Sequence, residues 1–515
     1  MSLRSLIQEF RSQEKTIRKG GDPARQQRLG RLTARERLTL LLDDPNTFLE
    51  LGLWQGYGMY SEWGGLPAAG LITGIGTIEG RRCMVIANDA TVKAGAMFPQ
   101  SIKKFLRAQR IAYSCKLPTV YLVDSSGVFL PLQDEIFPDE DDFGRIFRNN
   151  AVMSAAGIPQ YAAIMGNCIA GGGYLPVLCD QLLMTEGSGL YLAGPALVKA
   201  AIGQEVETEE LGGAKMHAEI SGTVDFKEPD DPACLKRLRH LISLLPENPI
   251  DDRLPPAEFP SEKIYEILNS KQYEAKELIA CLVDQGTIDE YKADYGKTLV
   301  TTFAKIGGKP CGIIANQRHL SKTGRGETEM GGVIYAESAD KAARFVMDCN
   351  QAQIPIIFTQ DVAGFMVGKG AEQSGIIRSG AKLVSAVSNS VVPKITLVVG
   401  NSFGAGNYAL CGKAYDPNFI FAWPNAKFAV MGADQAAETL FQIQKKKENW
   451  SDEEAQAHKR AISDKYKESA DIRYGAARGW LDGIIYPEET RAILSEVLKV
   501  VKPRAHAFHT GVIQV

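Results

Sequence analysis

Two stretches of small residues offer the most chemistry in this sequence, although little of it lies in side chains. GNSFGAGNYALCG occupies residues 400–412, and the similar GNCIAGGGYLPVL occupies residues 166–178. The first follows VPKITLVV, an apolar run with β-branched residues that is typical of a buried strand. Neither stretch contains a histidine or an acid, and small residues let a ligand approach the backbone closely.

A strand that ends in small residues and then enters a helix leaves free backbone N–H groups at the helix start. Such donors stabilise an oxyanion or an enolate, and the loss of one costs about 3 kcal/mol of transition-state stabilisation. The alternative is a purely structural role, in which the glycines only permit close packing of helix against strand. Because the same turn occurs twice, we favour the anion-binding interpretation.

The chain contains an internal repeat, in which three segments recur in the same order at separations of 228, 237 and 234 residues. The segments are IEGRRCMVIAND (78–89) with IGGKPCGIIANQ (306–317), VYLVDSSGVFL (120–130) with IFTQDVAGFMV (357–367), and IPQYAAIMGN (158–167) with VPKITLVVGN (392–401). The last register aligns Tyr174 with Tyr408, Ala170 with Gly404, Gly171 with Ala405, and Gly172 with Gly406. These matches predict a duplicated domain.

Each half alternates short apolar strands with amphipathic helices, which predicts βαβ units and an α/β fold. In the first half RCMVIAND and PTVYLVDS favour strands, and residues 97–115 favour a helix. A proline-rich segment at 244–260 predicts the linker between the halves. We therefore expect one domain over residues 1–255 and another over 256–515.

Helices are also expected outside the repeat. A long helical stretch is predicted over roughly residues 5–42, because its leucine and charge spacing is amphipathic. The segments SDEEAQAHKRAISDKYKESA (451–470) and PEETRAILSEVLKVV (487–501) predict helices on the outside of the C-terminal half.

Composition excludes several classes of protein. The net charge of −3 provides no overall positive field that would attract nucleic acid. Among the nine cysteines there is no C-x2-C pair that would indicate a zinc ribbon. No apolar run reaches the roughly 18 residues of a membrane span, and the N-terminus lacks the apolar segment of a secretory signal. A cytoplasmic protein is expected, and a processed mitochondrial matrix protein would have the same composition.

Longer blocks around both loops carry a family resemblance. MGNCIAGGGYLPVLCD, LYLAGPALVKAAIGQEVETEELGGAKMH and VPKITLVVGNSFGAGNYALCGKAYDPNFIFAWPNAKFAVMG resemble the carboxyltransferase (β) subunits of biotin-dependent acyl-CoA carboxylases. The resemblance implies two tandem crotonase-like domains (ClpP/crotonase superhelical ββα units). It further implies a homohexamer in which acyl-CoA binds the N-terminal domain and biotin binds the C-terminal domain across a subunit interface.

The same resemblance implies the site residues. Backbone amides at Ala170, Gly171 and Gly172 would hold the thioester oxygen of the substrate, and those at Ala405 and Gly406 would hold the ureido oxygen of biotin. Further binding positions implied for the cofactor or for coenzyme A are Lys93, Ala193, Gly194, Pro195, Phe403, Gly404 and Asn407. No metal is implied in this chain.

Biotin itself would supply the base, which explains why no pair of histidine and acid stands out. The sequence has no AMKM-like biotinyl-lysine motif and no glycine-rich ATP loop. The implied partner is therefore an α subunit that carries biotin carboxylase and the biotin carrier. His217 lies in one of the strong blocks, and we expect a structural role for it. Asp124 and Asp361 end matching strands and are also expected to be structural.

The acyl group is left open by the sequence. The blocks FPDEDDFGR, ANDATVKAG and GAGNYALCG are most similar to those of 3-methylcrotonyl-CoA carboxylase. The segment 316–342 is longer than that pattern and, with the third glycine of AGGGY, is similar to glutaconyl-CoA decarboxylase subunits. Residues 319–332 within it are either a surface loop or a pocket lid. A propionyl-CoA-type carboxylase and, more remotely, a stand-alone crotonase-like hydratase or hydrolase are also compatible with the sequence.

Overall fold

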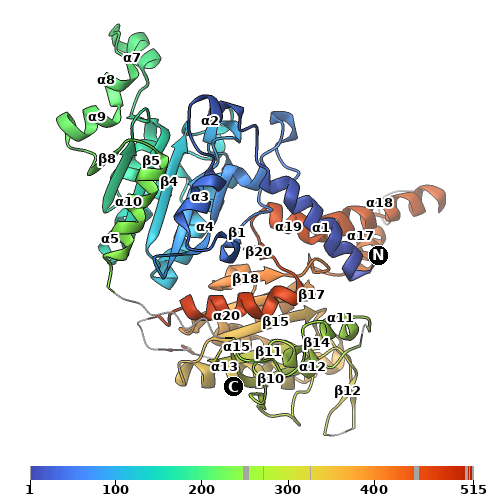
Figure 1. Cartoon of the computed structure of the whole chain (residues 1–515). Coiled ribbons are helices and arrows are strands. Elements are labelled where there is room, and N and C mark those ends of the chain that lie inside the picture. Colours follow the sequence, from blue (N-terminus) through green and yellow to red (C-terminus); the bar gives the residue numbers. More distant parts are fainter. Residues whose placement is uncertain are drawn as a thin grey trace. The chain divides into compact units, whose positions relative to one another are not determined.

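The computed structural model describes residues 2–246, 254–270, 272–324, 326–445, 452–504, 508–509 and 511–512 (Figure 1). The chain forms two compact units. One comprises Arg11–Asp251 with Ala477–Gly479, and is called the N-terminal unit. The other comprises Met1–Phe10, Asp252–Ala476 and Trp480–Val515, and is called the C-terminal unit. Residues 247–253 of the predicted linker lie outside the described residues.

The N-terminal unit is built on an eight-stranded sheet in the order β1-β2-β3-β4-β5-β6-β8, with β7 paired to β5. Its strands are β1 (Leu49–Leu51), β2 (Leu71–Ile78), β3 (Arg81–Asn88), β4 (Thr119–Ser125), β5 (Gln160–Ile169), β6 (Gln181–Thr185), β7 (Gly189–Tyr191) and β8 (Phe226–Glu228). β1, β2 and β3 pair antiparallel, and every later pair is parallel. Parallel strands need helices on both faces, which explains why β3 to β6 read as continuous apolar runs.

Two helix layers cover this sheet. α3 (Ala34–Leu41) and α10 (Asp231–Ser243) bury Leu38 and Leu238 against one face, beside Val85 and Val120 of the strands. α4 (Pro99–Cys115) lies on the opposite face, where Phe105 stacks on Tyr121 with ring centroids 5.7 Å apart. α5 (Phe143–Ala155) packs beside α4.

The C-terminal unit repeats this plan, with the strand order β20-β18-β17-β15-β11-β10-β9 and β19 paired to β17. Its strands are β9 (Asp289–Glu290), β10 (Leu299–Ile306), β11 (Lys309–Asn316), β15 (Ile356–Val362), β17 (Lys394–Phe403), β18 (Phe419–Ala422), β19 (Lys427–Ala429) and β20 (Gly483–Ile484). Again the first three strands pair antiparallel and the others parallel. β5 in one unit and β17 in the other lie inside their sheets between parallel neighbours and are called the central strands.

α13 (Ala336–Gln351) and α15 (Ile376–Asn389) pack on one face of the second sheet, in the hydrophobic cluster that includes Phe345, Phe358 and Leu383. α20 (Thr490–Val500) buries Leu494 and Val497 beside β10 and β11. The remaining helices are α11 (Lys263–Ile267), α12 (Ala275–Ala280), α14 (Lys369–Gln373), α16 (Gly404–Ala409), α17 (Ala433–Lys445), α18 (Asp452–Ala470) and α19 (Ile472–Ala477). The predicted strands and helices of the repeat are therefore confirmed.

The N-terminal stretch departs from the prediction of one long helix over residues 5–42. It forms α1 (Leu3–Arg18), α2 (Ala24–Arg28) and α3. Gly20 and Gly30 have φ of 65° and 64°, a left-handed conformation that ends a helix. The Thr33 hydroxyl accepts a hydrogen bond from the Glu36 amide and caps the start of α3.

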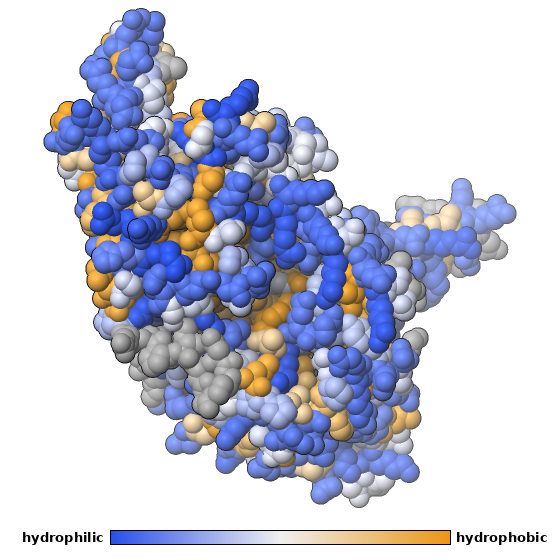
Figure 2. All heavy atoms as spheres, viewed as in Figure 1, coloured by the Kyte–Doolittle hydropathy of each residue, from blue (hydrophilic) through white to orange (hydrophobic). Residues whose placement is uncertain are grey.

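Three short helices stand away from the first sheet: α7 (Pro195–Ile202), α8 (Thr208–Gly212) and α9 (Ala214–Met216), drawn in green in Figure 1. The face of this arm shown in Figure 2 is mostly hydrophilic, with isolated apolar side chains. Exposed apolar residues of the arm and its flanks are Leu192, Leu197, Ile202 and Ile220. Within the described part of the chain, no helix is both long enough and apolar enough to cross a membrane.

Buried lysines recur at one position of the repeat. Lys104 on α4 is 2% exposed, and its ammonium donates to the carbonyl oxygens of Ala68 (2.9 Å) and Leu71 (2.6 Å). Lys341 lies at the matching position of α13 and is 1% exposed. Burial lowers the pKa of Lys104 to about 7 and that of Lys341 to about 8.

We expect Lys104→Met to destabilise the N-terminal unit, because the buried carbonyls of Ala68 and Leu71 each lose a hydrogen bond worth about 0.5–1.5 kcal/mol. Between pH 7 and pH 10 the folded protein holds a neutral amine while the unfolded chain is protonated, so the stability that the lysine contributes decreases as pH falls toward 7. The melting-temperature difference between wild type and variant is therefore expected to be larger at pH 9 than at pH 6.5. The exposed Lys15→Met is the control, and an equal difference at both pH values would contradict the lowered pKa.

Candidate active site

The first small-residue loop continues directly from the central strand of its sheet. β5 ends at Ile169, and the chain passes into the 3-10 turn Ala170–Gly173 and the short helix α6 (Tyr174–Val177). A turn that begins at Ala170 leaves the amides of Ala170 and Gly171 without an acceptor inside the turn. The predicted strand-to-helix transition is therefore present, with main-chain donors at its start.

Two other predicted segments lie near this loop because of strand pairing. β7 pairs with Asn167–Ile169 at the end of β5, and Ala193, Gly194 and Pro195 follow β7 at the start of α7. The segment before α4 reaches the same edge of the sheet. There the Ser125 hydroxyl donates to the Gly95 carbonyl at 2.7 Å, and the Ser126 amide donates to the Ala94 carbonyl.

Lys93 lies in a constrained part of that segment. Lys93, Ala94 and Gly95 have φ of 50°, 54° and 72°, a run that side-chain-bearing residues seldom adopt. A Cβ at Gly95 would lie 2.1 Å from the Asp124 carbonyl oxygen, so only glycine fits. Lys93 is exposed, and its place beside the β4 end suits a contact with an anionic group, which stays a prediction.

The second loop continues from the central strand of the other sheet. β17 ends at Phe403, which pairs with Ala429 of β19, and α16 begins at Gly404. Gly404 has φ of 52°, which turns the chain sharply. The amides of Ala405 and Gly406 belong to the first helical turn, where no acceptor exists within the helix, and no turn or loop bond between described residues uses them.

Hydrogen bonds inside this loop involve residues that sequence patterns did not single out. The Asn407 side chain donates to the Ser402 hydroxyl at 2.7 Å, and Ser402 donates to Gln360 at 2.5 Å. Gln360 in turn donates to the Leu410 carbonyl at 2.6 Å. Asn407, predicted to contact cofactor, thus ties α16 to the end of β15. Only spatial contact reveals Gln360 and Ser402, since neither belongs to a recognisable spacing.

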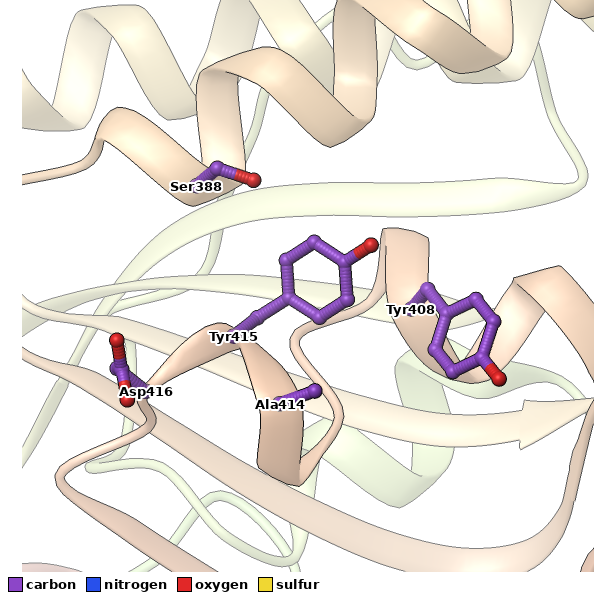
Figure 3. Close-up of a pocket in the computed structure, with 5 residues that line it drawn as sticks. All are labelled: Ser388, Tyr408, Ala414, Tyr415 and Asp416. Atoms are coloured by element: carbon purple, nitrogen blue, oxygen red, sulfur yellow. The ribbon is translucent and has the colours of Figure 1, made fainter. Parts of the chain in front are cut away.

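A cavity of about 460 Å³ adjoins the far end of α16 and is lined by Ser388, Tyr408, Ala414, Tyr415 and Asp416 (Figure 3). The rings of Tyr408 and Tyr415 lie side by side, with centroids 5.9 Å apart. Beside the first loop, Phe147 packs edge-on against Tyr174. In the register of the repeat, Phe147 aligns with Ala381.

Ionisable side chains near the loops are engaged or neutral. Burial raises the pKa of Cys168 to about 12, so its thiol stays protonated and donates to the Gly172 carbonyl at 3.5 Å rather than acting as a nucleophile. His217 bonds the Leu190 carbonyl at 2.7 Å and Ser221 at 2.9 Å, so both ring nitrogens are used in structure. The described residues contain no group of three or more His, Cys, Asp or Glu that could hold a metal.

The long segment after β11 forms a small hairpin rather than an open loop. β12 (Ser321–Lys322) pairs with β13 (Thr328–Glu329), and β14 (Val333–Ile334) pairs with β16 (Gly364–Phe365). Arg325 lies outside the described residues. The β14–β16 pair joins this segment to the chain that follows β15.

Comparison with known proteins identifies the family of the chain. The carboxyl transferase domain family matches residues 25–510. This chain belongs to that family. It is 44% identical over 511 residues to the mitochondrial methylcrotonoyl-CoA carboxylase beta chain of Dictyostelium discoideum, covering 96% of this chain and 84% of the relative.

One further relative and one solved structure are similar over nearly the whole chain. This chain is 42% identical over 520 residues to the biotin-dependent 3-methylcrotonyl-coenzyme A carboxylase beta1 subunit of Mycobacterium tuberculosis, covering 98% of this chain and 95% of the relative. The crystal structure of the P. aeruginosa geranyl-CoA carboxylase beta subunit superposes with a TM-score of 0.86 at 34% identity, covering 100% and 96%. The expected family, its crotonase-like fold and its carboxyltransferase activity are thereby confirmed.

We expect Gly406→Ala to slow turnover, because the new Cβ would lie 2.6 Å from Cγ2 of Val362 and would displace α16 with its amides. The KM for the acyl-CoA substrate should change little, since the displaced helix belongs to the other unit. Adding Val362→Ala removes the clash and is expected to restore turnover. Steady-state kinetics of the reconstituted holoenzyme measures both effects.

Gly370→Ala, on α14 with open space around its Cβ, is the matched control. Wild-type turnover in the Gly406→Ala variant would show that the position of this helix start is irrelevant to catalysis.

Proposed function

We propose that this carboxyltransferase moves a carboxyl group from carboxybiotin to 3-methylcrotonyl-CoA, at the γ-carbon of the acyl group. The choice of substrate rests on the near full-length similarity to 3-methylcrotonyl-CoA carboxylase beta subunits of an amoeba and a bacterium. The blocks FPDEDDFGR and ANDATVKAG support it as well.

The N-terminal unit would hold the substrate. Loss of a γ-proton from a 3-methylcrotonyl thioester leaves a dienolate whose charge is shared by the γ-carbon and the thioester oxygen. Amides of Ala170, Gly171 and Gly172 would donate to that oxygen and lower the energy of the charged state. Lys93 and the segment Ala193–Pro195 flank the loop and would contact coenzyme A.

The C-terminal unit would hold biotin. The residues present fit this group. The amides of Ala405 and Gly406 have no acceptor within the loop, so both are able to donate to one carbonyl-type oxygen. Phe403 and Gly404 would lie along the path by which the ring enters. Bound biotin supplies both the carboxyl group and the basic nitrogen. The chain's own contribution is to hold the ureido oxygen and to fix α16 through the Asn407–Ser402–Gln360 bonds.

Assembly forms part of the same proposal. Residues 1–255 would be the acyl-CoA domain and residues 256–515 the biotin domain, with catalysis at an interface between copies of the chain in a homohexamer. A separate α subunit would carry the biotin carboxylase and the biotin carrier. The exposure of Tyr174 and Tyr408, 51% and 49%, supports a surface that is covered by another copy.

Glutaconyl-CoA-type chemistry is the second candidate. The observation that favours it is the insertion after β11, which forms the β12–β13 hairpin and distinguishes this chain from the methylcrotonyl pattern. Both acyl groups react at the γ-carbon through a dienolate, so the same main-chain donors would serve either substrate. A propionyl-CoA-type enzyme would need enolate formation at the α-carbon instead.

The substrate is tested by offering 3-methylcrotonyl-, crotonyl-, propionyl-, geranyl- and acetyl-CoA to the holoenzyme with ATP and bicarbonate, and glutaconyl-CoA without them to follow decarboxylation. We expect the highest kcat/KM with 3-methylcrotonyl-CoA, measured by fixation of labelled bicarbonate. A reaction running only from glutaconyl-CoA to crotonyl-CoA would favour the second candidate.

The assembly is tested by mass photometry of the isolated chain. We expect particles with six times the 56.1 kDa chain mass. Because the active site would lie between copies, dilution that dissociates the particle should abolish turnover. Full activity in a monomeric fraction would contradict the interface assignment.

A further inference from the structure

Both central strands leave the regular parallel register at the same place. In the N-terminal unit Val123 pairs with Ile164 and Ser125 with Cys168, so two steps along β4 oppose four along β5. In the C-terminal unit Gln360 pairs with Val398 and Val362 with Ser402, with the same surplus in β17. Such bulges bend a strand and redirect the residues beyond it.

An aspartate fills each bulge. The Asn167 amide donates to Oδ1 of Asp124 at 3.2 Å, and the Asn401 amide donates to Oδ1 of Asp361 at 2.8 Å. The residue before each asparagine is glycine, and added Cβ atoms would lie 2.1 Å from Cγ of Asp124 at Gly166 and 2.4 Å from Cγ of Asp361 at Gly400. Each carboxylate therefore occupies the space that a side chain on the bulged strand would need.

Each aspartate is itself fixed from the opposite side. The Asp361 amide donates to Oδ1 of Asn316 at 3.0 Å, and the Asp124 amide donates to Oδ1 of Asn88 at 3.4 Å. Asn88 and Asn316 end the strands β3 and β11. A chain of contacts thus runs from one strand end through the aspartate to the backbone of the central strand, once in each unit.

An arginine balances each charge, but the two arginines come from different elements. Arg318, after β11, lies 3.1 Å from Oδ2 of Asp361, and the Tyr273 hydroxyl donates to the same oxygen at 3.1 Å. Arg37 of α3 lies 3.5 Å from Oδ2 of Asp124.

Arg37 also donates to the Met165 carbonyl, inside the bulge, at 2.9 Å, and pairs with Asp231 at 2.8 Å. Burial is the main cause that raises the pKa of Asp124. Arg37 opposes this shift, but it is shared with the second acid. Both units thus keep an aspartate with an arginine beside it, although the arginine lies on α3 in one unit and follows β11 in the other.

We propose that Asp124 and Asp361 are positioning residues that set the direction in which β5 and β17 deliver the amides of the two loops. The bulge lies immediately before the last strand residues, Cys168–Ile169 in one unit and Ser402–Phe403 in the other, and the loops follow directly. A change of strand direction there displaces every donor beyond it. This inference rests on the proposed roles of the two loops, but its first test does not depend on turnover.

Matched controls exist in the same units. Asp43 accepts the amides of Glu79 and Gly80 and pairs with Arg239, whereas Asp284 accepts those of Gly307 and Gly308 and pairs with Arg491. These acids brace the turns between β2 and β3 and between β10 and β11, far along the chain from the loops. Asp43→Ala and Asp284→Ala should therefore lower the melting temperature without moving the loop amides.

Hydrogen–deuterium exchange of the full chain tests the direction-setting role. Asp361→Ala should raise exchange at least tenfold in peptides covering residues 400–409 and leave residues 166–177 unchanged, and Asp124→Ala should do the reverse. Where an alanine variant fails to fold, Asp361→Asn and Gly400→Ala, or Asp124→Asn and Gly166→Ala, replace it with the same expected pattern at smaller amplitude. Unchanged loop exchange in all folded variants would overturn the proposal.

Kinetics of the holoenzyme supplies the second readout. Asp361→Ala should lower kcat about 100-fold, the loss expected from a displacement near 1 Å, while the KM for the CoA thioester stays within about twofold. Asp361→Asn should retain part of the rate, because its amide oxygen still accepts the Asn401 amide. A loss in the Asp284→Ala control equal to that in Asp361→Ala would assign both acids a merely structural role and overturn the proposal.

The two assignments fail in distinguishable ways. If wild-type protein turns over none of the CoA thioesters tested, the proposed function fails, and the exchange experiment still decides whether the aspartates hold the loops. If the substrate is correct but loop exchange is unaffected, only the positioning role is lost.

Discussion

A negatively charged oxygen is stabilised by backbone amides only when those amides cannot swing toward water or toward an internal acceptor. In this protein the amides proposed for this role lie at the first turn after a buried interior strand of the sheet, β5 in one unit and β17 in the other. Parallel neighbours hold each strand on both sides, and helices cover its faces, so the point at which the loop begins is rigid. Two side chains near the first loop offer no competing chemistry, since Cys168 stays protonated and both ring nitrogens of His217 are bonded.

The duplication shows which parts of this arrangement the two halves share. Both units keep an aspartate in the bulge, a glycine facing it and an asparagine that fixes it. Both also keep a buried lysine on the following helix, at Lys104 and Lys341. Burying such groups is costly unless each is paired, which means that the surrounding contacts must be retained together. Whole sets of contacts, rather than single residues, are thus repeated at the ends of the two strands that lead into the loops.

The halves diverge where they would meet different molecules. Phe147 packs against Tyr174 in the first half, whereas Tyr408 lines a cavity in the second and contacts Tyr415. Asp180 in the first half accepts the amide of Gln160, and Asn418 accepts that of Lys394 at the matching place in the second half. Asp180 also accepts the Ser154 hydroxyl, whereas the Ser388 hydroxyl donates to the Val384 carbonyl. The arm α7–α9 belongs to the first half and the hairpin β12–β13 to the second. A shared frame thus carries different surroundings in the two halves, in line with the different ligands proposed for them.

The sequence by itself determined the repeat, the α/β class, the two small-residue loops and the family, because glycine spacing and strand periodicity are local properties that survive in the order of residues. It did not reveal that Gly20 and Gly30 divide the N-terminal helix, since amphipathic spacing continues across them. The roles of Asn407, Ser402 and Gln360, the bulges opposite Asp124 and Asp361, and the arginines that balance these acids were decided only by the tertiary structure. Arg37 lies 194 residues from Asp231 and 87 from Asp124 along the chain. Such contacts depend on how strands and helices pack, and no local pattern of residues records them.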